Sequence, residues 1–380
     1  MKEEVPFIFG KIADTDNFTD RKVESKQLYQ NFSSLINTII ISPRRWGKTS
    51  LVKSVTQKIK AEKPKVKVCL LDIFNVKTEM EFYLVLAKTV LQSTSSKWEE
   101  IAENAKQFLS HLLPTISISP DSVSEISFGI SLNEMDKNVD KILDLAETIA
   151  KSKKIKIIVC IDEFQSINEF ENPLAFQRKL RSHWQQHQHV SYCLYGSKRH
   201  MLLDIFSNAS MPFYKFGDIM FLDKIDNAVW GEFIQKRFQE TKKTISEGCA
   251  KMLAGLVENH SYYVQQLAQQ SWLRTDKKCN ENIIMESYES LKNQLSLLFV
   301  GLIESLTIKQ INFLKAIISG ETALSSKDVL EKYKLGTSAN VIRIRESLLA
   351  KEIIDVNSKN IEIQDPMFKI WLKTDYFKMK

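Results

Sequence analysis

The sequence predicts an α/β protein with a parallel sheet core, followed by a helical lid and a C-terminal winged-helix domain. Three changes of pattern along its 380 residues support this prediction. Strand-like runs alternate with helical segments over residues 1–222, only helical segments follow over 223–304, and short helices with a hairpin fill 305–380. Single hydrophobic cores stop growing at roughly 250 to 300 residues. We therefore expect three domains with these boundaries.

Four apolar runs are the expected strands of the core, and helical sequence separates them. They cover residues 36–41, 65–74, 154–164 and 189–197. Strands that alternate with helices favour a doubly wound parallel sheet, with the ligand crevice at the carboxyl ends of the strands. Residues 115–133 alternate apolar side chains with serine and glycine after a Pro-Asp turn, which predicts an inserted hairpin.

The C-terminal segment predicts a winged helix-turn-helix, because three short helical stretches precede a hairpin over residues 353–364. The third of these stretches begins near residue 338. Its spacing predicts that Ile342, Leu348 and Leu349 face the core of this domain.

The charges of this third helix leave its partner open. Arg343 and Arg345 lie two residues apart, roughly 200° around a helix, so they cannot both enter one groove. Residues 325–352 hold six basic and four acidic side chains, a net charge of only +2. DNA binding is therefore one alternative, and a protein-interaction or autoinhibitory role is another.

The composition is that of a mostly folded globular chain, with 43% hydrophobic and 26% charged residues. Its net charge of +7 is compatible with an anionic partner such as nucleic acid, but many proteins without such a partner are as basic. The longest apolar run, Leu295–Ile303, is far shorter than the roughly 20 residues of a membrane span. No secretory signal pattern opens the sequence, so we expect a cytoplasmic protein with no membrane partner. Its oligomeric state is left open.

The five cysteines are odd in number and widely scattered, and no C-x-x-C pair occurs. This pattern disfavours a disulfide framework and a zinc site. We expect buried, reduced thiols. The residues concerned are Cys69, Cys160, Cys193, Cys249 and Cys279.

The stretch "SPRRWGKTS" lies between a strand and a helix, where a phosphate-binding loop of the pattern G-x-x-x-x-G-K-[ST] belongs. Gly47, Lys48 and Thr49 supply the last glycine, a cation that reaches the phosphates and a hydroxyl that holds Mg²⁺. Ser42 replaces the first glycine, which mainly allows a tight turn. The alternative is a basic strand-to-helix turn without a ligand. The expected nucleotide-binding residues here are Ser42, Pro43, Arg44, Arg45, Trp46, Gly47, Lys48, Thr49 and Ser50.

Two adjacent acids, Asp162 and Glu163, end the third expected strand in "IIVCIDEF". A metal-bound nucleotide needs an acid at a strand tip to hold Mg²⁺, and hydrolysis needs a base that orients the attacking water. Thr49 and Asp162 are therefore the expected Mg²⁺ ligands, and Glu163 is the expected base. The alternative is that both acids only cap the following helix.

A third candidate group follows the fourth expected strand, in "CLYGSKRH". Ser197 could contact the γ-phosphate or the attacking water. Arg199 is a candidate for neutralising charge in the transition state, and an ordinary surface charge is the equal alternative. We expect Arg44 and Arg45 to contact solvent or a partner rather than to act in catalysis.

These motifs, in this order, resemble the archaeal-type ATPases of the STAND branch of the AAA+ P-loop NTPases. The resemblance also rests on "NFTDRKVESKQL", "LYGSKRHMLLDIF", "MPFYKFGDIMFL" and "ENHSYYVQQLA", and it covers nearly the whole chain. In this family P-R-R-x-G-K-[ST] is the usual phosphate loop. The resemblance implies ATP and Mg²⁺ as cofactors, and a slow hydrolysis that switches the arrangement of lid and winged helix.

The resemblance also implies two contacts to the nucleotide base. Phe18, Arg21 and Glu24 match an F-x-[GD]-R-x-x-E element that the family places beside the base. The lid motif G-H-P-[YF]-Y has lost its glycine and proline here. His260 is still expected to face the nucleotide, while a helix cap at Ser261 is an equal alternative.

Two other functions stay open at this point. One is a DNA-binding regulator in which ATP only stabilises the fold, and the other is a nucleotide-binding scaffold without hydrolysis. Adenine is implied over guanine by the family alone, since no N-K-x-D motif occurs.

Overall fold

The computed structural model describes residues 5–11, 21–97, 100–101, 103–104, 107, 139–357 and 360–379. The chain divides into two compact units. The first is Arg21–Asp223, and the second joins Lys224–Lys380 with the N-terminal segment Met1–Asp20. The hairpin predicted over residues 115–133 lies outside the described residues, and so does Phe18.

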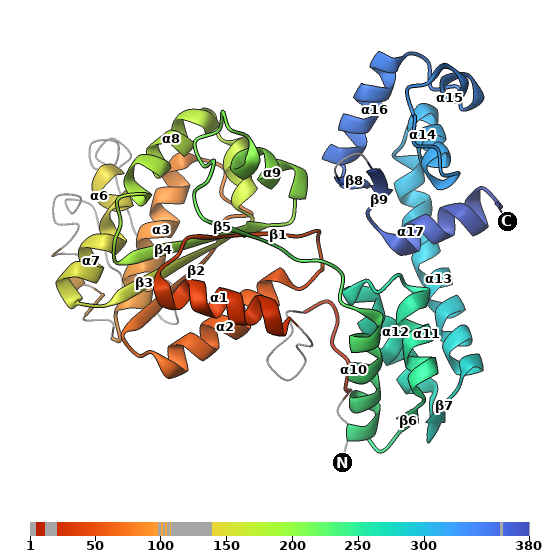
Figure 1. The fold of residues 1–380 in the computed structure, drawn as a ribbon, viewed down its shortest axis with the longest axis horizontal. Helices are drawn as coiled ribbons and strands as arrows, with labels where there is room; N and C mark the ends of the chain where they lie inside the picture. The colour runs from red at the N-terminus through yellow and green to blue at the C-terminus, as the bar shows by residue number, and fades with distance from the viewer. Residues whose placement is uncertain are drawn as a thin grey trace. The chain divides into compact units, whose positions relative to one another are not determined.

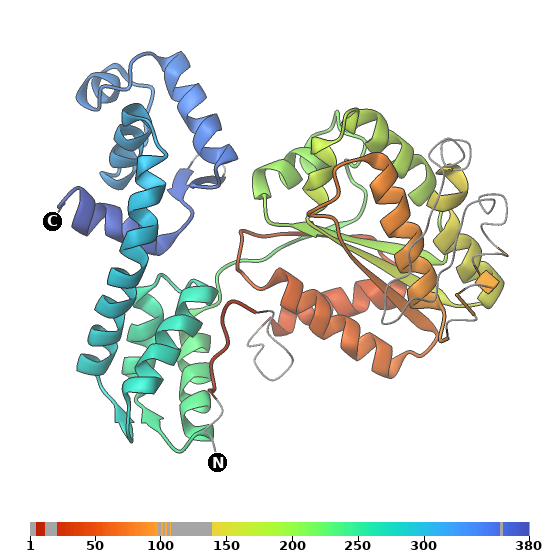
Figure 2. The ribbon, with the colours of Figure 1, turned by 180° about the vertical axis from the view of Figure 1, so that it is seen from behind.

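The first unit is a five-stranded parallel sheet with helices on both faces (Figures 1 and 2). Its described elements are α1 (Lys22–Ser34), β1 (Thr38–Ile41), α2 (Lys48–Glu62), β2 (Val66–Asp72), α3 (Glu79–Thr94), α6 (Val139–Leu143), α7 (Leu145–Lys153), β3 (Lys156–Asp162), the 3₁₀ helix η2 (Phe164–Glu169), α8 (Pro173–Trp184), β4 (Val190–Gly196), α9 (Arg199–Ser207) and β5 (Asp218–Phe221). The strand order is β2-β3-β4-β1-β5, and all neighbouring pairs are parallel. The predicted α/β core is confirmed, and β5 is an edge strand that the sequence did not indicate.

Both faces of the central strands are buried, as expected for a parallel sheet between two helical layers. Successive side chains of a strand point to opposite faces. Ile39 and Ile41 of β1 belong to one apolar core, together with residues of α3, α8 and α9. Ile40 points to the other face, which α1 and α2 cover (Figure 1), and it is equally buried. Strand β1 is therefore packed on both faces up to Ile41, where the loop begins.

The carboxyl ends of β1, β3 and β4 reach the same edge of the sheet. Ile41 pairs with Gly196, and Ile161 pairs with Leu194. Strand β4 thus separates the loop after β1 from the acids at the end of β3. The polar residues that follow these three strands are consequently brought together, although they are distant in sequence.

The second unit is mainly helical. Its described elements are α10 (Asn227–Glu240), β6 (Thr244–Ile245), α11 (Glu247–Leu256), α12 (Ser261–Arg274), β7 (Lys278–Cys279), α13 (Glu281–Glu304), α14 (Ile308–Ile318), α15 (Lys327–Lys332), α16 (Ser338–Ala350), β8 (Ile354–Asn357), β9 (Asn360–Ile363), α17 (Pro366–Trp371) and a π-helical turn (Leu372–Tyr376). The expectation of helices alone over residues 223–304 was wrong at β6 and β7, which pair in parallel over two residues.

Side-chain oxygens fix where helices of this unit begin, because they accept hydrogen bonds from the free amides of the first turn. Thr307 and Gln310 form a reciprocal capping box at the start of α14. Further capping side chains belong to Asp226, Ser246, Asn280, Thr337 and Asp365. These caps define the helices that the sequence pattern placed only approximately.

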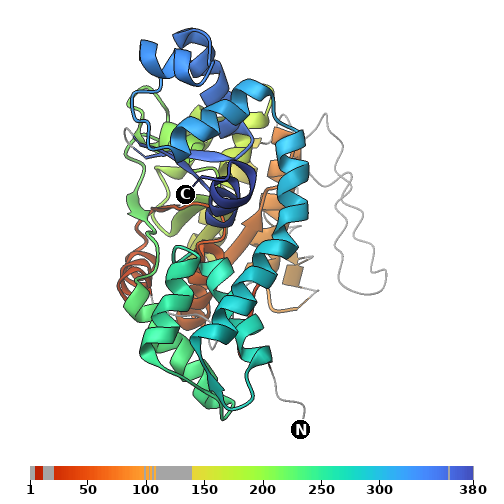
Figure 3. The ribbon, with the colours of Figure 1, turned by 90° about the vertical axis from the view of Figure 1, so that its right-hand side faces the viewer.

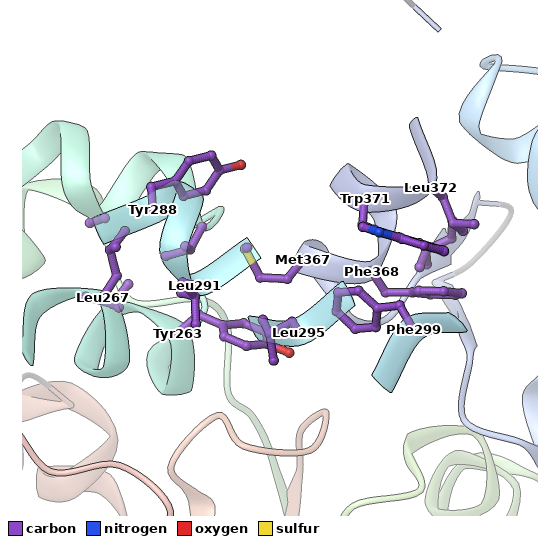
Figure 4. Close-up of a cluster of buried hydrophobic side chains, with 14 of the residues drawn as sticks. Tyr263, Leu267, Tyr288, Leu291, Leu295, Phe299, Met367, Phe368, Trp371 and Leu372 are labelled. Atoms are coloured by element: carbon purple, nitrogen blue, oxygen red, sulfur yellow. The ribbon is translucent and has the colours of Figure 1, made fainter. Parts of the chain in front are cut away.

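Helix α13 runs from the α10–α12 helices to the C-terminal helices (Figure 3). Apolar side chains from α12, α13 and α17 share one core (Figure 4). The ring of Phe299 lies 5.3 Å from that of Phe368 and 5.8 Å from that of Trp371, between centroids. The predicted lid and winged helix therefore lie in one compact unit, and their boundary at residues 304 and 305 stays a prediction.

The described N-terminal residues, 5–11, group with the second unit and not with the sheet. The ring centroid of Phe7 lies 5.7 Å from that of Phe238 on α10. Arg237 Nε also donates a hydrogen bond to the carbonyl oxygen of Pro6, at 2.5 Å. The core that we expected to begin at residue 1 thus begins later, because Phe7 finds its apolar partners on α10.

The C-terminal part has the predicted helices and an antiparallel β8–β9 pair. On α16, Val341, Ile344 and Leu348 are buried, which confirms Leu348. Ile342 is 48% exposed, so its predicted core position was wrong. The buried stripe follows the spacing three and four residues apart, and Ile342 falls beside it. Leu349 is half-buried.

The cysteines carry free thiols, and the predicted burial is confirmed for all but Cys249, which is half-buried. Among the described residues, no helix has the length and the apolar character that a membrane crossing requires.

Candidate functional site

The loop between β1 and α2 has two residues with a left-handed backbone and leads into a helix without a side-chain cap. Gly47 is the N-cap of α2, with φ 89°, and Arg45 also has a positive φ of 65°. Gly47 offers no side chain to cap the first amides of the helix. These amides, together with the positive end of the helix dipole, are the groups that attract a phosphate.

At Ser42 the backbone does not adopt the left-handed conformation that favours glycine. Its φ is not positive, and its side chain is fully buried. A serine therefore meets no conformational penalty at this position, since only a left-handed backbone would favour glycine. Pro43 beside it is also buried, whereas Arg44 and Arg45 are exposed.

Lys48, the first residue of α2, is buried, with only 7% of its surface exposed. Its Nζ lies 3.7 Å from Oε1 of Glu163. A buried ammonium group is costly unless a negative group is close. Glu163 supplies one such charge, so the lysine is held at the sheet edge where the loop ends.

Thr49 and Asp162 are in direct contact. The Thr49 hydroxyl donates a hydrogen bond of 2.8 Å to Oδ2 of Asp162. Burial raises the pKa of the Asp162 carboxyl to about 6, and the nearby Lys48 charge and the Thr49 hydroxyl only partly offset that effect. Hydroxyl and carboxylate oxygens are the ligand types that Mg²⁺ prefers, and a cation would stabilise the ionised form of this buried acid. The pair therefore fits a Mg²⁺ ion.

Glu163 is fixed by hydrogen bonds to one of its oxygens. Oε2 accepts from the Ser197 amide at 3.1 Å, from the Ser197 hydroxyl at 2.8 Å and from Gln165 Nε2 at 2.5 Å. Burial alone would raise the pKa of Glu163, but the Lys48 charge and these hydrogen bonds outweigh burial and lower it. The carboxylate is thus ionised at neutral pH, as a base that orients water must be.

Sequence reasoning missed Gln165 and Gly196. Gln165 lies in η2, and its side chain is buried directly against Gly196 at the end of β4. A Cβ added at Gly196 would run into Gln165 Oε1. Glycine is therefore required here for a close approach, and the only sequence signal was its position before Ser197.

Arg21 is buried, with only 3% of its surface exposed. Its guanidinium pairs with Glu24 Oε1 at 2.8 Å and donates to the carbonyl oxygens of Trp46 and Asp223, at 3.4 Å and 2.6 Å. The matched Arg21 and Glu24 are thus brought together, and Arg21 contacts the backbone of the phosphate loop at Trp46. Asp223 as a partner was not predicted.

His260 belongs to the second unit, where it is the N-cap of α12 and is 6% exposed. Its ring centroid lies 5.0 Å from that of Tyr263. Ser261 is the first helical residue, so the alternative that Ser261 caps this helix was wrong. The expected contact between His260 and a nucleotide stays a prediction.

The remaining predicted residues lie beside the same loop and strand. Ser50 is buried in the first turn of α2, and Trp46 is half-buried. Arg199 begins α9, two residues after Ser197, and its side chain is half-buried. Their contributions to binding or catalysis stay predictions.

Comparisons with known proteins agree with this architecture. Residues 297–374 match the family described as a probable winged helix domain. The structure resembles a Walker-type ATPase of Pyrococcus abyssi, with a TM-score of 0.65, 17% identity and coverage of 97% of this chain and 99% of that chain. It also resembles the ORC2 protein of Aeropyrum pernix, solved as ADPNP–ADP complexes, with a TM-score of 0.60, 12% identity and coverage of 96% and 94%.

At these identities the likeness concerns the fold. No match to a curated protein was found. The predicted resemblance to archaeal AAA+ ATPases is confirmed at that level, as is the fold class of a parallel-sheet core with a C-terminal winged helix. The site residues therefore have to be judged on their own geometry.

Proposed function

We propose that this chain binds ATP with Mg²⁺ and hydrolyses it slowly, as a nucleotide-dependent switch of the STAND/AAA+ type. The observation that carries the proposal is the convergence of Lys48, Thr49, Asp162, Glu163 and Ser197 at one edge of the sheet. A cation, a hydroxyl, two acids and a polar side chain are the parts that phosphoryl transfer to water requires.

Binding rests on the loop and on Lys48. The first amides of α2 and the Lys48 ammonium would hold the phosphates, because both present positive charge where β1 ends. Lys48 would exchange its contact with Glu163 for one with the nucleotide. Thr49 and Asp162 would hold Mg²⁺, which supplies charge neutralisation on the phosphates when it is bound.

Hydrolysis rests on Glu163. Its ionised carboxylate would accept a hydrogen bond from the attacking water and orient it toward the phosphate. Ser197 and Gln165 hold this carboxylate through three hydrogen bonds. One of these contacts must break before the attacking water can bind to Glu163. We therefore expect turnover to be slow. Ser197 would then respond to the presence of the γ-phosphate.

Predictions from the residue patterns and, for His260, from the family resemblance complete the proposal. His260 would approach the base, Arg199 would neutralise charge, and residues 223–304 and 305–380 would act as lid and winged helix. A cytoplasmic location belongs to the same set. The switch role rests on analogy with STAND proteins, since fold alone does not determine function.

Two alternatives have specific support. A non-hydrolysing scaffold is favoured by the hydrogen bonds that already occupy Glu163 Oε2. A DNA-binding regulator is favoured by the exposure of Arg343 and Arg345 on α16. Their opposite directions around the helix weaken a single-groove contact, so we place this function second.

The direct experiment measures nucleotide binding and phosphate release by the purified chain, with Mg²⁺ and with a chelator. We expect ATP binding that Mg²⁺ strengthens, and phosphate release that ends when the metal is removed. Absence of ATP binding at millimolar concentrations would overturn the proposal. Binding without any phosphate release would leave the scaffold as the function.

A further inference from the structure

We infer that Arg21 is a positioning residue that links the phosphate loop to the segment through which the chain leaves the first unit. The inference extends the proposed nucleotide site, since it assigns that site a route to the rest of the chain. It rests on the contacts of one buried guanidinium group.

These contacts join three separate segments. Arg21 lies 25 residues before Trp46 and 202 residues before Asp223, and it donates to the carbonyl oxygens of both. Glu24 on α1 balances its charge, at 2.8 Å. A planar guanidinium presents several donors in a fixed arrangement, so it can hold two carbonyls and a carboxylate at once. In Arg21, Nη1 holds Glu24 while Nη2 donates to both carbonyl oxygens, and a lysine, with a single nitrogen, cannot divide the contacts in this way.

The exit segment runs beside the strand that carries the phosphate loop. Phe221 of β5 pairs with Ile41, and the amide of Leu222 donates to the carbonyl oxygen of Ile41 at 3.1 Å. Asp223 comes next, and its carbonyl oxygen is 2.6 Å from Arg21. The same nitrogen, Nη2, also donates to the carbonyl oxygen of Trp46, which directly precedes the glycine of the loop. A change in the loop backbone is therefore transmitted to Asp223 by one side chain.

The next residue is anchored in the other unit. Lys224 Nζ lies 3.3 Å from Glu258, which also pairs with Lys369 of α17 at 2.8 Å. Both contacts are partly exposed, and such pairs contribute little stability. They nevertheless orient the chain on the far side of Asp223. The two units are thus joined at Asp223 and Lys224. Asp223 is bound by Arg21 of the first unit, and Lys224 is bound by Glu258 of the second.

Arg21→Lys tests this link, with Arg178→Lys on the exposed face of α8 as the matched control. Hydrogen exchange is followed in peptides covering residues 43–50 and 221–227, without nucleotide and with Mg²⁺ and ATP. Without nucleotide, we expect Arg21→Lys to accelerate exchange about tenfold in both peptides, as the loss of a charged hydrogen bond predicts. The control should change neither peptide.

With Mg²⁺ and ATP, the parent should gain protection in both peptides, whereas Arg21→Lys should gain it only over residues 43–50. Equal protection of residues 221–227 in the parent and in Arg21→Lys would overturn the inference. So would unchanged exchange, or acceleration of one peptide alone, in the nucleotide-free variant. If the parent binds no nucleotide, the proposed function fails, while the nucleotide-free comparison still decides whether Arg21 links the two segments.

Discussion

The Thr49 hydroxyl lies 2.8 Å from the Asp162 carboxylate, although 113 residues separate the two in sequence. Strand β4 lies between β3, which ends at Asp162, and β1, which precedes the loop that leads to Thr49 on α2. The two oxygens therefore meet across the edge of the sheet, beyond the strand ends. Such an arrangement positions two hard ligands before a metal ion arrives, which reduces the reorganisation that binding requires.

The first prediction concerns Lys48. Replacing it in Lys48→Ala should weaken ATP binding about 100-fold or more, because a buried cation that faces the phosphates is lost. Titration with a fluorescent ATP analogue measures the affinity. Lys53→Ala removes an exposed lysine from the same helix and should leave the affinity unchanged. Equal affinities of Lys48→Ala and the parent would show that the loop does not hold the phosphates through this residue.

The second prediction concerns the pH dependence of stability. Burial raises the pKa of Asp162 from 3.8 to about 6. An acid whose pKa is higher in the folded state costs stability where it ionises, so the cost is absent below about pH 4 and complete above about pH 6. Without metal or nucleotide, Asp162→Asn should raise the free energy of unfolding at pH 7.5 by about 1 to 3 kcal/mol and have no such effect at pH 4.

Denaturant unfolding of the parent and of Asp162→Asn at the two pH values checks this prediction. The difference between them must grow with rising pH. If Asp162→Asn is less stable than the parent by the same amount at both pH values, ionisation of Asp162 does not cost stability in the free protein.

A third prediction follows from the close contact at Gly196. In Gly196→Ala the new methyl group would push Gln165 aside and detach it from Glu163. We expect a loss of about 1 to 3 kcal/mol in stability, as for other overpacked sites. Phosphate release should be about tenfold faster or more, with ATP binding retained, because one of the contacts that hold Glu163 is already broken. Gly301→Ala is the control, because a Cβ there meets nothing within 4 Å. Unchanged phosphate release by a folded Gly196→Ala protein would show that the contact of Gln165 with Glu163 does not affect hydrolysis.

The winged helix gives a fourth prediction. If the alternative DNA function holds, the chain binds duplex DNA with an affinity that falls steeply with salt, and Arg343→Ala or Arg345→Ala weakens that binding. Lys236→Ala, an exposed cation of α10, should not. Electrophoretic or fluorescence titrations at two salt concentrations measure this. If neither Arg343→Ala nor Arg345→Ala changes the affinity for DNA, α16 is not the helix that contacts DNA.

The sequence predicted the elements that carry local signals. The strands with long apolar runs and the loop ending in Gly47, Lys48 and Thr49 could be read from patterns of a few residues. Strand β5 was missed because "DIMF" is short and half-exposed at the edge of the sheet. Ile342 was wrongly expected in the core. Val341 and Ile342 are both apolar neighbours on α16, and helical spacing alone does not show which of the two is buried.

Contacts between distant residues could not be predicted in the same way. The support of Glu163 by Gln165 depends on how tightly η2 approaches Gly196, and the partners of Arg21 depend on where β5 leaves the sheet. Neither contact has a local sequence pattern. Likewise, the grouping of residues 5–11 with α10 depends on the packing of Phe7, and any apolar surface could have accepted that ring.

The central claim is that Glu163 makes this chain a hydrolase rather than a nucleotide-binding scaffold. Phosphate release by Glu163→Gln under saturating Mg²⁺ and ATP tests it most directly, with Glu171→Gln on an exposed site as the control. We predict a rate about 100-fold or more below that of the parent, with ATP binding retained, because the amide cannot orient the attacking water as a base. A rate equal to that of the parent would contradict the assignment.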